Sequence, residues 1–186
     1  MTRRGFCQFV VLASGVPVFP LPARRWGQAR ETRSSGGEVQ IVLFSDAGVR
    51  LETVRTRKVV KSDEEWRRQL SPLAFNVARR GQTERPFSGD YWNLHEKGLF
   101  RCVCCDTALF SSAAKFDSGT GWPSFWQPIA AENVERHPSR VTIHVESEVT
   151  CRLCDAHLGD VFDDGPRPTG LRYCIDSVSL RFVKSV

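Results

Sequence analysis

Two pairs of cysteines constrain the fold of this chain more than any other feature of its sequence. Cys102 and Cys105 form one Cys-x2-Cys pair, and Cys151 and Cys154 form a second, with 45 residues between the pairs. Each pair can turn two thiolates toward one ion, so the four cysteines predict a tetrahedral structural zinc site that is closed to substrate. The long interval predicts a substantial insertion between the two metal-binding turns.

Disulfide bonds are the alternative use for these cysteines, since an exported protein would permit them. Cysteine pairs at the two ends of a long loop suit a metal better than two very small disulfide rings. Cys104 does not fit the ligand spacing and is interpreted as a spectator or a spare thiol. We therefore predict one zinc ion per chain.

The spacing of the apolar runs predicts a mainly β protein. From Gly98 onward, short apolar runs alternate with clusters of Gly, Pro and Asp. The runs are residues 99–103, 141–149 and 171–183. We expect antiparallel sheets that form an open barrel or a two-sheet core around the four-cysteine site.

The residues before this β region predict a hairpin followed by two short helices. Two β-branched runs, 39–44 and 49–60, flank a glycine-bearing turn, as in a hairpin. Ser62 begins a capping box for a helix that ends near Leu70, and Ser71 followed by proline can begin a second helix. Both helices would be short.

The N-terminal segment resembles a bacterial twin-arginine export signal. The sequence Thr-Arg-Arg-Gly-Phe at 2–6 precedes an uncharged run that ends at Ala23. Three prolines interrupt this run and leave it too short to span a bilayer, so we expect no stable membrane anchor. The segment 1–29 is predicted to be a signal peptide, which would place the protein in the periplasm or another extracytoplasmic location; it would be cytoplasmic if the leader is not a signal. Finding unprocessed protein in the cytosol after fractionation would contradict export.

Charge argues against a nucleic-acid partner. The formal net charge of +5 comes from residues 1–35, where six arginines face one acidic residue. The rest of the chain has 20 basic and 20 acidic residues and is neutral. A zinc-ribbon module that binds nucleic acid would need a basic face, so charge disfavours this alternative function.

Cys174 stands apart from the other cysteines. Arg172 lies two residues earlier, and a nearby cation favours a reactive thiolate. A lone cysteine is more often an inert, buried residue. The rest of the chain has to decide between these two interpretations.

Taken together, residues 62–183 resemble the type B methionine sulfoxide reductases, which reduce the R epimer of methionine sulfoxide in proteins. Several sequence blocks carry the resemblance. They are Gly-Gln-Thr-Glu at 81–84, the two Cys-x2-Cys pairs, Lys-Phe-Asp-Ser-Gly-x-Gly-Trp-Pro-Ser-Phe at 115–125, His-Leu-Gly at 157–159 and Arg-Tyr-Cys-Ile at 172–175. On this basis the chain divides into the signal peptide, a linker with the hairpin at 30–61, and a reductase domain at 62–186.

The resemblance implies a thiol mechanism for protein repair under oxidative stress. Cys174 would attack the sulfoxide sulfur as a thiolate favoured by Arg172, release methionine and become a sulfenic acid. Trp122, with Phe125 as its neighbour, would form an apolar wall for the substrate methyl group. His157 would hydrogen-bond to the sulfoxide oxygen or protonate it. The electrons would come from a thioredoxin-like protein or another thiol reductant without an organic cofactor, and we expect a monomer.

Two aspartates depart from the family pattern. Asp160 stands where many members have a second histidine, and Asp176 stands where they usually have asparagine. Anions at these positions would raise the pKa of the thiol. One hypothesis is that one of them is protonated and donates a proton to the substrate. The alternative is a catalytically impaired member that binds oxidised proteins.

The third departure is Thr120, which stands where many members have the resolving cysteine. Without that thiol, the sulfenic acid on Cys174 needs either Cys104 or an external thiol for its reduction. Because Cys104 lies within a predicted metal-binding turn, we favour the external reductant.

Overall fold

The computed structural model describes residues 36–138 and 147–185. The predicted signal peptide and most of the predicted strand at 141–149 therefore lie outside the described residues. The described part of the chain contains eleven β-strands, two α-helices and three short 3-10 helices. The prediction of a mainly β protein is thus confirmed.

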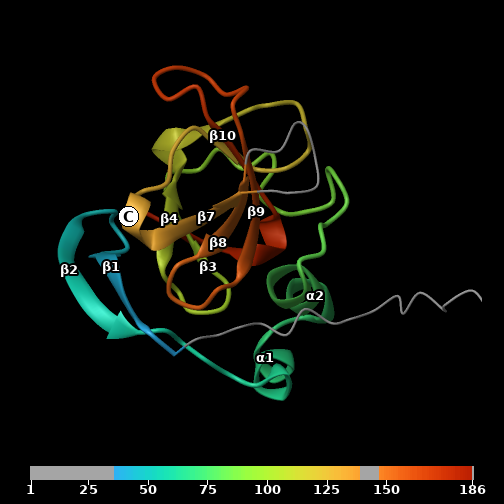
Figure 1. Ribbon diagram of the computed structural model, residues 1–186. Coiled ribbons are helices and arrows are strands. Elements are labelled where there is room, and N and C mark those ends of the chain that lie inside the picture. The colour runs from blue at the N-terminus through green and yellow to red at the C-terminus, as the bar shows by residue number, and fades with distance from the viewer. Residues whose placement is uncertain (1–35, 139–146, 186) are drawn as a thin grey trace, which may run out of the picture.

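Three antiparallel sheets make up the fold (Figure 1). The largest has six strands, in the order β5 (Lys115–Phe116), β6 (Ser124–Phe125), β10 (Arg172–Ile175), β9 (His157–Phe162), β8 (Ser147–Cys151) and β7 (Val134–Pro138). The second has the order β11 (Leu180–Lys184), β3 (Gly98–Cys102) and β4 (Ala108–Ser111). The third is the predicted hairpin of β1 (Glu38–Phe44) and β2 (Arg50–Arg57). No closed barrel forms within the described strands.

Aromatic side chains from both larger sheets form the core. The Phe110 and Phe125 rings stack with centroids 4.5 Å apart. Phe100 meets Phe125 edge to face at 5.0 Å, and Tyr173 lies 5.8 Å from Phe110. Aromatic pairs in such geometries stabilise a core beyond the free energy of burying their area. The core thereby joins β3 and β4 to the strands that carry the predicted site.

The two helices begin where their caps predict. Ser62 closes the capping box of α1 (Asp63–Gln69), and Ser71 caps α2 (Pro72–Arg80). The second helix ends at Gly81, which adopts the left-handed conformation that favours glycine. Within the described segments, no helix is long and apolar enough to cross a membrane.

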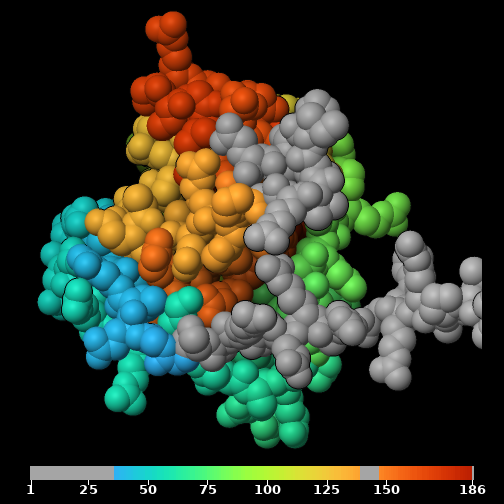
Figure 2. All heavy atoms as spheres, in the orientation of Figure 1, coloured from blue at the N-terminus to red at the C-terminus, as the bar shows by residue number. Residues whose placement is uncertain are grey.

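The hairpin packs against the rest of the protein through specific polar contacts. The buried Asn133 side chain accepts from the main-chain N–H of Val42 at 2.8 Å and donates to its carbonyl oxygen at 2.9 Å. The chain after β2 is also anchored, since Lys58 pairs with Asp155 at 2.5 Å. In Figure 2 the hairpin (blue to cyan) covers the left flank of the molecule, and the loop between β9 and β10 (orange-red) projects at the top of the view.

Candidate active site and metal centre

The alternation of side chains along β10 creates one polar and one apolar face. Tyr173 and Ile175 point into the core, with exposures of 4% and 0%. Arg172 and Cys174 alternate with them along β10 and occupy the other face, since side chains alternate along a strand. Asp176 follows the strand in extended backbone conformation. A two-residue period therefore brings an arginine, a thiol and a carboxyl group together.

Strand pairing places further acidic groups beside the thiol. Cys174 is paired directly with Asp160 of β9, and Asp160 is paired with Glu148 of β8. Residues directly opposite each other in antiparallel strands share a face. Gly159 permits the close approach of β9, because a Cβ atom there would lie 2.1 Å from the Cys174 carbonyl oxygen.

Cys174 is partly buried, and the Thr120 hydroxyl oxygen lies 3.9 Å from its sulfur. Burial raises the pKa of the Cys174 thiol above its ordinary value. Arg172 and the Thr120 hydroxyl group lower this pKa, whereas the charges of Asp176 and Asp160 raise it. The thiol therefore ionises less readily than an ordinary cysteine, although Arg172 and Thr120 partly offset the effect of burial.

The Arg172 guanidinium is held between an acid and an aromatic ring. It donates two hydrogen bonds of 2.8 Å to the Asp164 carboxylate and lies 4.3 Å from the Phe162 ring centroid. Such a bidentate pair fixes the orientation of the guanidinium group. The Arg172 guanidinium therefore interacts with both the Asp164 carboxylate and the Cys174 thiol.

Asp176 is the most deeply buried of the acids near the thiol, with 2% exposure. Its carboxylate accepts from the Glu84 main-chain N–H at 2.8 Å, and its other oxygen lies 3.8 Å from His157 Nε2. Burial raises the pKa of Asp176 to about 7. The Glu84 N–H and His157 lower this pKa, and the Glu84 and Asp160 carboxylates raise it. Asp176 can therefore exchange a proton near neutral pH.

His157 lies between two carboxyl groups. Its Nδ1 is 2.9 Å from Glu148 Oε1, and its Nε2 faces Asp176. Burial also raises the pKa of Asp160, His157 lowers it, and the charge of Glu148 raises it. This arrangement can hold and transfer a proton beside the thiol.

The structure separates the two aromatic residues predicted to form the methyl-binding wall. Trp122 is partly buried, and its Nε1 donates to the Glu84 carbonyl oxygen at 3.2 Å. The adjacent Pro123 carbonyl accepts from Ile175 N at 3.0 Å, which fixes this loop beside the Cys174 strand. Phe125 is fully buried among the core rings. It supports the sheet from within and has no surface to offer a substrate.

Three acids of this site are absent from the candidates chosen from sequence. They are Glu84, Glu148 and Asp164. Glu84 belongs to the Gly-Gln-Thr-Glu block, so its sequence signal was present without an assigned role. Glu148 and Asp164 carry no local pattern, because strand pairing and a loop place them beside His157 and Arg172.

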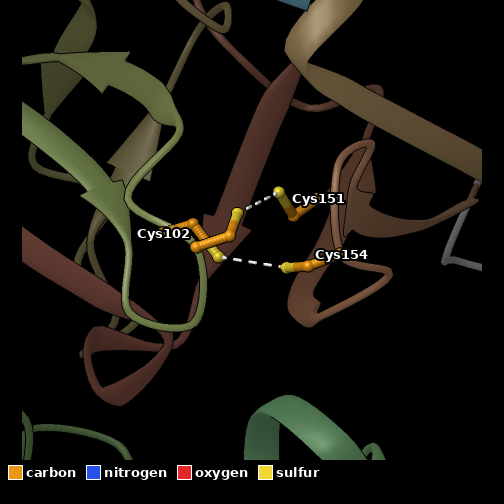
Figure 3. A group of neighbouring side chains, drawn as sticks. Cys102, Cys151 and Cys154 are labelled. Atoms are coloured by element: carbon orange, nitrogen blue, oxygen red, sulfur yellow. Dashed lines mark hydrogen bonds between the residues drawn. The ribbon is translucent and has the colours of Figure 1, made fainter. Parts of the chain in front are cut away.

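The four predicted metal ligands form one cluster. Their sulfur atoms all lie within 4.8 Å of one another. Figure 3 shows Cys102 facing Cys154, with their sulfurs 3.6 Å apart, and Cys151 is 3.5 Å from Cys105. Zinc–sulfur bonds of about 2.3 Å would set the sulfurs of a tetrahedral site about 3.8 Å apart. The donor set therefore fits a four-thiolate zinc ion.

The two metal-binding turns share a backbone pattern. Asp106 N donates to the Cys102 carbonyl, and Asp155 N donates to the Cys151 carbonyl, both at 2.9 Å. Both aspartates have positive φ angles, of 64° and 56°. The six cysteines in the described residues are free thiols, so the disulfide alternative finds no support. Cys104 is buried beside the cluster but is not one of its four members.

Comparison with known proteins identifies close relatives. The family model of the SelR domain matches residues 70–184. The chain is 55% identical over 127 residues to "Peptide methionine sulfoxide reductase MsrB" of Herminiimonas arsenicoxydans, a match that spans 68% of this chain and 93% of that protein. It is 56% identical over 123 residues to the protein of the same name from Thioalkalivibrio sulfidiphilus, spanning 65% and 88%. It is 54% identical over 125 residues to "Peptide methionine sulfoxide reductase B1, chloroplastic" of Oryza sativa subsp. japonica, spanning 67% and 58%.

Proposed function

This chain belongs to the MsrB family of peptide methionine sulfoxide reductases, and from that premise we propose that it reduces the R epimer of methionine sulfoxide in proteins. The observation that carries this proposal is the position of Cys174, a partly exposed thiol between a cation and several carboxyl groups. Its substrates would be oxidised proteins or peptides.

In the proposed reaction, the Cys174 thiolate attacks the sulfoxide sulfur. The sulfoxide oxygen passes to Cys174, methionine leaves, and the thiol is oxidised to a sulfenic acid as the substrate is reduced. Arg172 favours the thiolate, and Trp122 offers the partly exposed aromatic surface for the substrate methyl group. Departure of the oxygen from the substrate sulfur requires a proton.

Asp176 is the acid best suited to supply that proton. Its pKa of about 7 leaves a substantial protonated fraction at neutral pH. His157 lies between Asp176 and Glu148 and would replace the proton after each turnover. The carboxyl group that replaces the usual asparagine would thus serve as a general acid.

Reduction of the Cys174 sulfenic acid back to a thiol would depend on an external thiol. Thr120 faces the Cys174 sulfur at the position where a resolving cysteine would act. Cys104 is buried with its carbonyl oxygen held by the Gln69 side chain at 2.7 Å. We therefore propose that thioredoxin or a small thiol attacks the sulfenic acid directly.

The four-cysteine cluster would hold a structural zinc ion. Cys102, Cys105, Cys151 and Cys154 would supply all four ligands and leave no position for substrate. The bound ion would join the turn after β3 to the turn after β8, and so would stabilise the sheet that carries Cys174.

A single-turnover experiment tests the proposed function. The reduced protein, freed of excess thiol, is mixed with peptides that contain either the R or the S epimer of methionine sulfoxide. One equivalent of methionine is expected from the R epimer only, together with a dimedone adduct on Cys174. Turnover of the S epimer alone would contradict the proposed substrate, and a Cys104–Cys174 disulfide in non-reducing peptide maps would contradict the external reductant.

The pH dependence tests the proposed proton donor. The wild-type rate should rise with thiolate formation and stop rising near pH 7, because ionisation of Asp176 then offsets the gain in thiolate. Asp176→Asn should lower the rate at pH 6 by about 100-fold and remove this break from the profile of kcat against pH. Asp160→Asn is the matched comparison and should keep the break. If the break disappears in Asp160→Asn instead, Asp160 is the donor.

A further inference from the structure

Glu84 connects three parts of the site that are far apart in sequence. It lies in the loop after α2 and is buried, with 3% exposure. Its main-chain N–H donates to Asp176 Oδ1 at 2.8 Å, and its carbonyl oxygen accepts from Trp122 Nε1 at 3.2 Å. One residue therefore contacts both the proposed proton donor and the proposed methyl-binding surface.

The Glu84 side chain, like its backbone, makes two hydrogen bonds. Its carboxylate accepts from the main-chain N–H of Ser177 at 2.6 Å and of Val178 at 3.1 Å. These two residues follow Asp176 directly, so the carboxylate fixes the chain on the C-terminal side of the proposed acid. Two main-chain donors stabilise an ionised carboxylate in a buried position.

The main chain at Gly89 packs directly against the Glu84 carboxylate. A Cβ atom at Gly89 would lie 2.7 Å from Glu84 Oε1 and 2.4 Å from Ser177 Oγ. Contacts this short show that only glycine lets the loop cross here. The Ser177 hydroxyl oxygen also accepts from Tyr91 N at 3.3 Å. The loop that contains Glu84 therefore folds back over its own carboxylate and covers it.

We propose that Glu84 is a positioning residue of the reductase site, which holds the Asp176 carboxyl group and the Trp122 indole in fixed relation to Cys174. The inference rests on the proposed function and goes beyond it, because Glu84 makes no contact with the reacting thiol among the interactions of the described residues. Its role is to act through the two residues that it binds.

Glu84 also affects the charge of Asp176. The groups that face Asp176 are Glu84 from the preceding loop, His157 and Asp160 from β9, and Cys174 from β10. An anionic Glu84 opposes the ionisation of Asp176, so its removal lowers the pKa of Asp176. This electrostatic effect distinguishes Glu84 from a residue that only supports the fold.

Glu84→Gln tests both consequences. The pH titration of the Asp176 carboxyl carbon, followed by NMR and assigned through Asp176→Asn, should move down by about one pH unit. The break in the pH profile of kcat should move with it, and the rate at pH 7 should fall about tenfold. Glu96→Gln is the matched control, since Glu96 is exposed and pairs with Lys184 at the end of β11; it should change neither quantity.

Glu84→Asp separates charge from geometry. It keeps the anion but shortens the side chain, so the Asp176 titration should stay near its wild-type position while the rate falls through lost N–H contacts. An unchanged Asp176 titration and rate in Glu84→Gln would overturn the proposal. If Glu84→Gln does not fold, Glu84→Asp decides: a wild-type rate would overturn the proposal, and a reduced rate with a retained titration would support it. The NMR titration does not require turnover. It therefore tests the effect of Glu84 on Asp176 even if the wild-type protein fails to reduce the R epimer.

Discussion

Cys174→Ser is expected to abolish methionine sulfoxide reduction, with a loss of at least about a thousandfold in kcat. A serine hydroxyl group cannot pass between thiol and sulfenic acid, and its oxygen is a far weaker nucleophile than a thiolate. The measurement is the formation of methionine from an R-sulfoxide peptide with dithiothreitol as the reductant. The same variant should form no dimedone adduct in the single-turnover experiment.

Cys104→Ser is the matched control for this loss. It replaces a buried thiol that belongs to neither the reactive group nor the four-sulfur cluster. Its rate should stay within about twofold of wild type if an external thiol reduces the sulfenic acid. Normal turnover in Cys174→Ser would show that another residue is the nucleophile. Loss of turnover in Cys174→Ser, with the unfolding transition unchanged, would support Cys174 as the nucleophile of an enzyme. It would argue against a protein that only binds oxidised partners.

Cys151→Ser is expected to be the most destabilising of the single changes considered, lowering the free energy of unfolding by about 4 kcal/mol or more. Cys151 is fully buried and lies at the end of β8, so the variant loses a metal ligand and leaves three thiols clustered without their ion. The check is urea unfolding together with the zinc content of the purified protein. Wild type should contain one zinc ion per chain, and the variant should contain much less.

Chelation provides an independent test of the same site. Removing metal from the wild-type protein should lower its unfolding midpoint toward that of Cys151→Ser, and Cys104→Ser should keep its zinc. A Cys151→Ser protein that retains one zinc ion and wild-type stability would show that the cluster is not the metal site.

Much of the fold was predictable because short-range rules set it. The capping box at Ser62, the serine–proline start at Ser71 and the turn between the two runs of the hairpin each satisfy local backbone hydrogen bonds, and each lies where the sequence predicts. The four-cysteine cluster was also predictable, since each pair forms its own turn. These features depend on residues that are close neighbours along the chain.

Other features depend on packing between distant segments. Phe125 and Trp122 belong to one sequence block, yet Phe125 enters the core and Trp122 remains partly exposed. Phe125 lies in β6 and stacks on Phe110 of β4, whereas Trp122 lies in the loop before β6. The resemblance identified the block, but it did not specify which of the two rings would be buried in the core.

Residue type and spacing along the chain were enough to predict the family, the mainly β class and the clustering of four cysteines, and to single out Cys174 as the proposed nucleophile. Tertiary structure alone decided how the thiol is surrounded. Pairing of β10 with β9 and of β9 with β8 brings Cys174 beside Asp160 and Glu148, and burial raises the pKa of Asp176 to about 7. Desolvation and through-space charge set that pKa. Both depend on which segments pack together, so Glu84, which is 92 residues from Asp176, becomes part of the site only when the chain folds.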